Sequence, residues 1–427
     1  MQYQRTLGPI RGIALTVTTF VGTGLMILPA ISVAEAGSFA FYAWLITALA
    51  VMPVAFVFAL LGSKYPSAAG ASHYIGKVLG PKSERAIGWL FLSILLVGPT
   101  VAIKVAAAYL AVLLNVAEGQ ILNLSIITLI GMLLFAIAGL KNSASFQTVI
   151  VLCLITTVVA LFTLSMKASS GAVILNVEAP TALPDLSTTL IATGTIFWCF
   201  IGIEVMAHMG AEFKNPSRDF PIALLGGIVI VVALYLATVL MIAHHKVYGD
   251  ELTNSQSLAL LVGALLGEEA RRYFALGAYI IAFSNVGVYI LGFSRMIQSM
   301  ASQHALPYYF AKLTASGTPV RAVSLVGIIG IASLLFFEYS GTPLSWLIEM
   351  TNGAFLLIYL LTCAIAIKLL TGTLKAIACI ATLFCIAMAT FVGESMLFAL
   401  TAFGLAFVWE HMKSQKRPIP DEKIHVQ

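Results

Sequence analysis

The chain has 427 residues, of which 60% are hydrophobic and only 10% are charged, and its mean hydropathy is +1.00. Soluble domains carry about 25% charged residues, so this composition excludes a soluble protein and predicts an all-α polytopic membrane protein. The net charge of +5 does not indicate a nucleic-acid partner, because no basic stripe with interleaved aromatic residues is present.

Apolar runs that are long enough to span a membrane recur from one end of the chain to the other. A membrane helix needs about 20 apolar residues. This criterion predicts twelve transmembrane helices, at residues 8–35, 39–63, 86–114, 121–140, 146–166, 189–211, 221–244, 272–300, 321–339, 344–369, 374–391 and 395–412. We therefore expect a transmembrane domain over residues 1–413 and a cytoplasmic tail over residues 414–427.

Basic residues are concentrated in alternate loops. One set of loops, with Arg5, Lys82, Arg85 and Lys214 among its members, holds most of the Lys and Arg residues, whereas the other set is mainly acidic. The positive-inside rule assigns the basic set, and with it both termini, to the cytoplasm. Both termini on one side require an even number of spans, in agreement with twelve. The expected location is a bacterial cell inner membrane.

Glycine interrupts the first and the sixth predicted spans. The first break reads Gly22, Thr23, Gly24, and the second reads Trp198, Cys199, Phe200, Ile201, Gly202, followed by Glu204. A broken membrane helix frees backbone groups that lipid cannot satisfy, so each break must line a cavity or be buried in protein. Paired breaks in two halves of a chain point to a transporter binding site.

The two broken spans begin on opposite sides of the membrane. Five spans counted from each break therefore run in opposite senses, which is the arrangement of an inverted repeat. The sequence predicts one repeat at about residues 8–166, the other at about 189–369, and two extra helices at 374–412.

The two breaks offer complementary chemistry to a small ligand. The amides of Gly22–Gly24 at the start of a half-helix favour an anion, whereas the carbonyls of Cys199–Ile201 suit an ammonium group. Together they predict a site for a zwitterion, hence an amino acid, with Trp198 and Phe200 beside its apolar side chain. The alternatives are a small-residue packing seam for the glycines and ordinary core contacts for the aromatic residues.

Four polar residues inside the spans are candidates for coupling or gating. Burying the charge of Glu204 costs about 2.5–3.5 kcal/mol on insertion scales, so we expect it to bind a proton, pair, or face water; the alternative is a structural hydrogen bond. His208, one turn further, can share that proton or be an ordinary polar residue near the cytoplasmic mouth. Lys104 either faces the cavity or snorkels, and Tyr289 is an aromatic gate or packing.

The sequence argues against catalysis and against ATP-driven transport. It contains no His-Glu-x-x-His motif or comparable catalytic cluster within the spans, and no phosphate-binding loop. No metal ion or cofactor is expected.

Four motifs, in this order, resemble the amino acid–polyamine–organocation superfamily of secondary transporters. They are Gly22-Thr23-Gly24 with Leu28-Pro29, the run from Trp198 to Glu204, Lys214-Asn215-Pro216 with Phe220-Pro221, and Gly317-Thr318-Pro319-Val320. The resemblance covers nearly the whole chain. Within the superfamily, the stretches at 197–202 and 211–221 look most like those of the bacterial methionine and branched-chain amino acid exporters.

The resemblance implies a five-plus-five inverted-repeat core with two extra helices. It also implies that Gly22–Gly24 holds the substrate carboxylate and that the backbone of Phe200–Gly202 holds the amino group. Trp198 then lies beside the substrate, Tyr289 matches an aromatic gating position, and Glu204 matches a carboxylate linked to proton sensing.

We therefore expect a secondary active exporter of methionine, leucine, isoleucine and valine that works by alternating access with proton antiport, as a monomer or homodimer in lipid. Pro99, Thr100 and Ala102 in the third span do not make the polar pocket of a basic-amino-acid antiporter. An importer or exchanger of the same fold, and a membrane amino acid sensor without transport, are the alternatives. Sodium is not excluded as the coupling ion, because Ser and Thr abound in spans one and eight.

Overall fold

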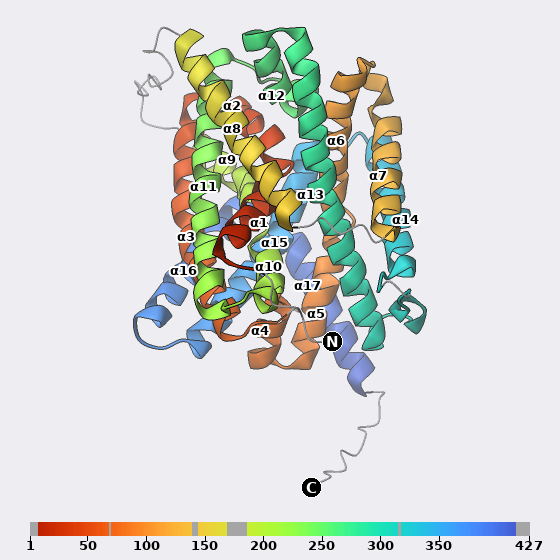
Figure 1. Ribbon diagram of the computed structural model, residues 1–427. Helices are drawn as coiled ribbons and strands as arrows, with labels where there is room; N and C mark the ends of the chain where they lie inside the picture. Colours follow the sequence, from red (N-terminus) through yellow and green to blue (C-terminus); the bar gives the residue numbers. More distant parts are fainter. Residues whose placement is uncertain (1–6, 68–69, 139–143, 169–185, 315–316, 416–427) are drawn as a thin grey trace.

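The computed structural model describes residues 7–67, 70–138, 144–168, 186–314 and 317–415. Within these ranges the chain is almost entirely helical, and the one β-type pairing is an isolated bridge between Leu7 and Phe213. The long helices stand side by side as a bundle (Figure 1). This confirms the predicted all-α architecture.

Eight α-helices are present in the described residues up to Ala168. They are α1 (Pro9–Val21), α2 (Gly24–Ala36), α3 (Ala40–Lys64), α4 (Gly70–Leu79), α5 (Pro81–Ile94), α6 (Gly98–Leu114), α7 (Ile121–Ile137) and α8 (Ala144–Ala168). Helices α1 and α2 are the two parts of the first predicted span, and they meet at an angle of 47°. The first predicted break is therefore present.

The described residues from Leu186 onward form nine more. They are α9 (Leu186–Ile196), α10 (Ile203–Met209), α11 (Pro216–His245), α12 (Glu251–Leu266), α13 (Glu268–Ser302), α14 (Val320–Tyr339), α15 (Leu344–Leu369), α16 (Gly372–Val392) and α17 (Glu394–Gln415). Short 3₁₀ segments occur at Gly37–Phe39, Glu118–Gln120, Phe197–Phe200, Gly210–Glu212 and Tyr308–Ala311. The segment Phe197–Phe200 lies between α9 and α10, where the second break was predicted.

The number of spans agrees with the prediction. In the described part of the chain, ten helical segments are long and apolar enough to cross a membrane, and the bent pair of α1 and α2 adds an eleventh. Helix α7, an apolar helix of 17 residues, occupies the one predicted position that is left. The chain is a multi-pass membrane protein.

The third span differs from the prediction, which treated residues 86–114 as one helix. The chain leaves the helix at residues 95–97 and resumes it as α6, with Pro99 near its start. Pro99 has no N–H to donate to the preceding turn, which favours an interruption directly before it. Helices α4 and α12 were also not predicted, because each is shorter than the 20-residue criterion.

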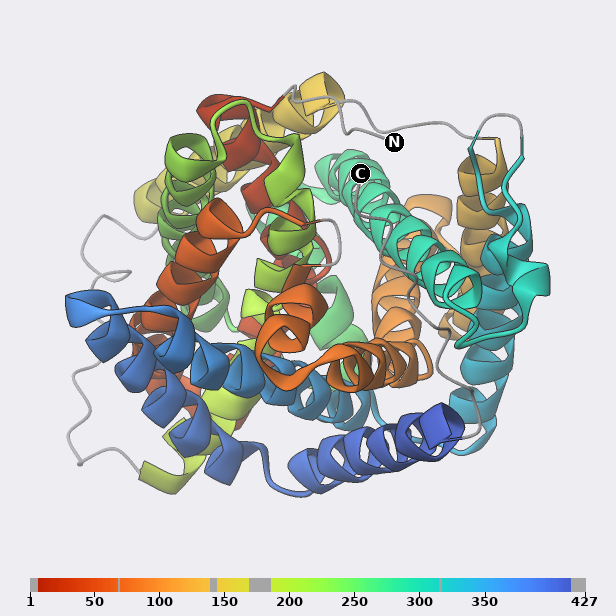
Figure 2. The same cartoon turned by 90° about the horizontal axis from the view of Figure 1, so that it is seen from below.

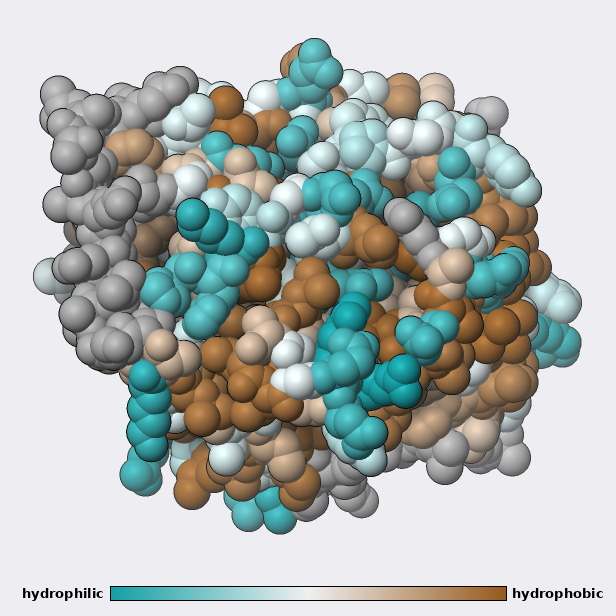
Figure 3. Space-filling view, turned by 90° about the horizontal axis from the view of Figure 1, so that it is seen from above, coloured by the Kyte–Doolittle hydropathy of each residue, from teal (hydrophilic) through white to brown (hydrophobic). Residues whose placement is uncertain are grey.

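Contacts between distant segments gather the basic loops on one face. Lys64 Nζ lies 3.4 Å from the carbonyl oxygen of Leu369, and the amide of Leu7 donates to the carbonyl of Glu212 at 3.1 Å. All four residues belong to segments that the positive-inside rule grouped together. Hydrophilic residues are spread across the opposite face, which is seen from above in Figure 3. The assignment of the basic face to the cytoplasm stays a prediction.

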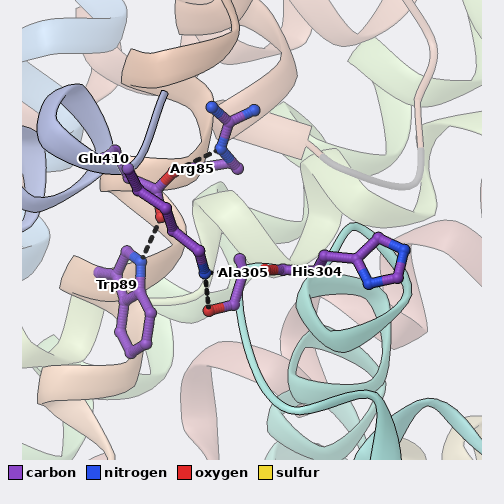
Figure 4. A network of polar contacts seen from close by, with 6 residues as sticks. Arg85, Trp89, His304, Ala305 and Glu410 are labelled. Carbon is purple, nitrogen blue, oxygen red and sulfur yellow. Dashed lines mark hydrogen bonds and ion pairs between the residues drawn. The ribbon is translucent and has the colours of Figure 1, made fainter. Parts of the chain in front are cut away.

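The two extra helices, α16 and α17, lie at one edge of the bundle (Figure 2). A buried carboxylate joins α17 to α5: Glu410, with its side chain only 2% exposed, accepts from Arg85 Nε at 2.6 Å and from Trp89 Nε1 at 3.0 Å (Figure 4). One turn further, Lys413 Nζ donates to the carbonyl of His304 at 2.8 Å. Helix α17 is thus connected to α5 and to the segment after α13.

We expect the substitution Glu410→Ala to lower the free energy of unfolding by about 1–3 kcal/mol, because it leaves the two donors on α5 without their acceptor. The measurement is the midpoint of thermal unfolding of the detergent-solubilised protein. Glu268→Ala is the control, since its pair with Arg271 is exposed and is worth about 0–1 kcal/mol. Equal midpoints for the two variants would contradict the role given to Glu410.

Candidate functional site

A cavity lies between the two broken helices. Its empty space, including the part that is open to solvent, is about 620 Å³, which is within the range of small-molecule sites. The first break contributes Thr19, Phe20, Gly22, Thr23 and Gly24, and the second contributes Trp198 and Ile201. The fold therefore brings together two segments that are about 180 residues apart in the sequence.

Most of the predicted substrate-binding residues line this cavity. They are Gly22, Thr23, Gly24, Trp198, Ile201 and Tyr289. The other three, Cys199, Phe200 and Gly202, are buried behind the lining. The backbone of the second break therefore approaches the cavity mainly through Ile201.

Three further elements complete the wall, and sequence reasoning identified only part of them. The interrupted third span contributes Ile94, Gly98, Pro99 and Ala102, helix α13 contributes Asn285, Val286, Ile290 and Phe293 besides Tyr289, and α15 contributes Thr351 and Phe355. Pro99 and Ala102 were expected near the site, whereas Thr100 does not line the cavity. Asn285 was missed, although a lone Asn in an apolar span was its visible signal.

Two side chains from other spans satisfy carbonyls at the first break. Helix α1 ends there, so its last carbonyls have no partner within the helix. The amide of Asn285 donates through Nδ2 to the carbonyl oxygens of Thr18 at 3.0 Å and Thr19 at 3.4 Å. The hydroxyl of Tyr235 donates to the carbonyl of Phe20 at 2.9 Å.

The second break is satisfied in the same way. Asn352 donates through Nδ2 to the carbonyls of Gly194 at 2.9 Å and Thr195 at 3.4 Å, and the hydroxyl of Tyr359 donates to the carbonyl of Phe200 at 3.2 Å. Each break therefore has one asparagine that bonds two successive carbonyls and one tyrosine on a third. We call these four side chains the capping residues.

Steric constraints explain why glycine occupies positions 22, 24 and 202 in the breaks. A Cβ atom on Gly22 would lie 2.2 Å from Cγ of Asn285, and one on Gly24 would lie 2.7 Å from the hydroxyl oxygen of Tyr235. Gly202 has a φ of +132°, a conformation that residues with a side chain rarely adopt. Glycine therefore lets the capping residues approach the first break and lets the chain turn at the second.

Glu204 is part of the second break. Its side chain is buried, with the residue only 1% exposed. Its Oε2 accepts from the amide of Gly202 at 3.1 Å and from the hydroxyl of Tyr359. Its Oε1 has no hydrogen-bond partner among the described residues. The carboxyl group thus shares a tyrosine with a carbonyl of the break and keeps one oxygen unpaired.

Of the other two candidates for proton coupling, the structure describes the side chain of Lys104 alone. The side chain of His208 lies outside the part of the molecule that the structure describes, so its role stays a prediction. Lys104 does not line the cavity; its Nζ lies 2.7 Å from Oε2 of Glu338 on α14, and its side chain is 11% exposed. This ion pair joins α6 to α14 near the end of α14, and the snorkelling alternative for Lys104 stays a prediction.

The cavity has polar groups but no charged wall. In the described part of the chain, its lining includes no Asp, Glu, Lys, Arg or His side chain. Its polar side chains are those of Thr19, Thr23, Trp198, Asn285, Tyr289 and Thr351. A charged group of a ligand in this cavity would therefore be met by backbone dipoles and neutral side chains.

Comparison with known proteins gives concordant results. A family model described as "Amino acid permease" matches residues 7–408. The L-methionine/branched-chain amino acid exporter YjeH of Escherichia coli (strain K12) is 33% identical over 415 residues, which cover 97% of this chain and 98% of that protein. The uncharacterized amino acid permease YecA of Bacillus subtilis (strain 168) is 27% identical over 370 residues, or 86% of each chain.

A solved structure has the same fold. The crystal structure of MhsT in complex with L-phenylalanine superimposes with a TM-score of 0.66 over 94% of this chain and 99% of that one. The sequence identity is 13%, so this likeness concerns the fold alone.

We expect Gly22→Ala to lower the thermal unfolding midpoint, because the new methyl group must displace Asn285 and uncover the carbonyls of Thr18 and Thr19. Leaving such groups unsatisfied costs about 1–3 kcal/mol each. Gly287→Ala is the matched control: this glycine is buried in the same helix as Asn285, and a Cβ there would meet nothing within 4 Å. A midpoint as high for Gly22→Ala as for the control would show that Asn285 does not cap this break.

Proposed function

Because the chain belongs to the amino acid permease family, we propose that it exports methionine, leucine, isoleucine and valine across the inner membrane by alternating access, in exchange for protons. Membership of this family makes the chain a transport protein for a small-molecule amino acid substrate, and not an enzyme. The specific substrates, the direction and the proton coupling are our proposal, supported by the relative that is named as an exporter.

The uncharged cavity is the observation that carries the substrate class. Its described lining holds no Asp, Glu, Lys, Arg or His side chain, and most of it is apolar. A basic amino acid or a polyamine would bury a side-chain charge there without a partner, which is costly. A neutral apolar side chain, in contrast, gains free energy by leaving water.

The zwitterionic end of the substrate requires partners of both signs. The amides of Thr23 and Gly24 stand at the start of α2, a helix of 13 residues, and favour the substrate carboxylate through their N–H groups and the helix dipole. The freed carbonyls of the second break, next to Ile201 in the lining, favour the ammonium group. Trp198 and Phe355 then contact the apolar side chain from two sides of the cavity.

Tyr359 supports proton coupling at Glu204. Its hydroxyl has one hydrogen and two acceptors, the carbonyl of Phe200 and Oε2 of Glu204. An ionised Glu204 attracts that hydrogen, because a charge-assisted bond is the stronger one. The carbonyl of Phe200, which adjoins Ile201 of the cavity lining, is then left for the substrate ammonium. A proton on Glu204 weakens this attraction, so the hydroxyl turns to Phe200 and competes with the ammonium.

Proton and substrate therefore favour opposite states of the second break. Thermodynamic linkage makes this relation reciprocal, so that binding of either one weakens binding of the other. Mutually exclusive binding is what an antiporter requires. Rocking of one set of helices against the other then changes the side from which the cavity is open.

Counterflow in proteoliposomes tests the substrate class. Vesicles loaded with unlabelled methionine or leucine are expected to accumulate the labelled amino acid, and an inward proton gradient is expected to drive export. We expect Trp198→Ala to raise the half-saturating concentration, because the substrate side chain loses an apolar contact. Trp346→Ala, on an exposed residue outside the cavity lining, is expected to leave it unchanged. Absence of counterflow for every neutral amino acid would refute the proposed substrates.

We expect Glu204→Gln to exchange amino acids without a response to an imposed proton gradient, since the amide can hold the Tyr359 hydroxyl but cannot take up a proton. The measurement is the counterflow rate and its dependence on the gradient, compared with the unaltered protein. Glu349→Gln is the control, because this half-buried carboxylate on α15 lies outside the cavity lining. A Glu204→Gln protein with an unchanged gradient response would remove Glu204 from the mechanism.

A further inference from the structure

The end of α1 presents three carbonyl oxygens to two neutral side chains. The carbonyls belong to Thr18, Thr19 and Phe20, and their donors are the amide of Asn285 and the hydroxyl of Tyr235. The C-terminal end of a half-helix carries partial negative charge, and in transporters with broken helices such ends coordinate a sodium ion or a proton. The sequence leaves both sodium and protons as possible coupling ions. Whether a sodium ion or a protein group lies at the end of α1 distinguishes sodium coupling from proton coupling.

The side-chain amide of Asn285 lies where a cation bound to this helix end would lie. The residue is only 6% exposed, and its Nδ2 lies within hydrogen-bond distance of two successive carbonyl oxygens. A side-chain amide has two N–H donors, so one Asn285 satisfies both carbonyls without a charge. A metal ion could reach these oxygens only after the Asn285 side chain had moved away.

Steric contacts hold Asn285 in this position. Its Cγ, Oδ1 and Nδ2 all lie within 2.5 Å of where a Cβ atom on Gly22 would stand. Gly22 thus provides the space that the amide fills, and the side chain packs directly against the break. The Asn285 amide is therefore both hydrogen-bonded to the end of α1 and packed against it.

We propose that the Asn285 amide takes the place of a coupling cation at the first break, so that this transporter works without sodium, and that Asn285 is the residue that sets this ion specificity. The proposal rests on the transport function proposed above. The second break gives independent support, because Asn352 and Tyr359 cap it with the same pair of neutral donors. The second break adds a carboxyl group, Glu204, whose Oε2 accepts from the amide of Gly202 and the hydroxyl of Tyr359 and which takes up the proton in the function proposed above.

The substitution Asn285→Asp introduces a negative charge with almost no change in shape. A carboxylate oxygen replaces the amide nitrogen and faces the carbonyls of Thr18 and Thr19, so three oxygens converge with no donor between them. Sodium and other hard cations prefer such oxygen ligands. The variant should therefore gain a cation site that the unaltered protein lacks, whereas Asn285→Ala loses the donor without gaining a ligand.

The experiment is thermal unfolding of the purified full-length protein at alkaline pH, in sodium chloride and in choline chloride of equal concentration. We expect the same midpoint in both salts for the unaltered protein. For Asn285→Asp, the midpoint should be lower in choline chloride and rise as sodium chloride is added, because a ligand that binds only the folded state stabilises it. For Asn285→Ala, it should be lower in both salts to the same extent.

Two results would overturn the proposal. One is a midpoint or a counterflow rate of the unaltered protein that depends on sodium, and the other is an Asn285→Asp protein that responds to neither sodium, lithium nor potassium. Unfolding requires no substrate, so this readout is independent of the proposed amino acids. A failure of counterflow for every neutral amino acid, together with the expected salt responses, would refute the proposed substrates and leave the role of Asn285 intact.

Discussion

Unpaired carbonyl groups inside a membrane are the constraint on which the rest of this structure depends. Lipid offers no hydrogen bonds, so a helix that stops in mid-membrane must find donors within the protein. Here the donors are two asparagines and two tyrosines, and each break has one of each. These four side chains satisfy carbonyl groups that the broken helices leave without a partner.

The capping residues also fix how the helices are arranged. They come from α11, α13 and α15, and each bonds a break that lies more than 150 residues away in the sequence. Each cap approaches its break closely, and glycine at positions 22 and 24 leaves the space that the first two caps occupy. Glycine, cap and cavity are therefore parts of one arrangement, and a change in any of them alters the others.

Neutral polar side chains lie at the cavity and the breaks, whereas most of the buried charged side chains lie elsewhere in the bundle. The described lining of the cavity is uncharged, while the buried and half-buried ion pairs stand at other joints of the bundle, as in Arg85 with Glu410 and Lys104 with Glu338. Glu204 is the exception, because it lies at a break without an ion pair and keeps one oxygen unpaired. The two breaks thus share their neutral caps and differ in one carboxyl group, which adds the proposed proton uptake to the substrate-binding role of the second break.

The sequence by itself determined the spans, the two breaks and the grouping of loops, because these follow from local properties: the length of apolar runs, glycine within them, and the positions of Lys and Arg. It also identified Glu204, since a carboxyl group in an apolar run is costly wherever it points. Only the tertiary structure decided what each polar residue contacts. Asn285 bonds a carbonyl 267 residues away, and nothing in its own segment tells such a contact from simple packing. The interruption of the third span and the pairing of Lys104 with Glu338 were decided in the same way, because a partner in space leaves no mark on the residues beside it in sequence.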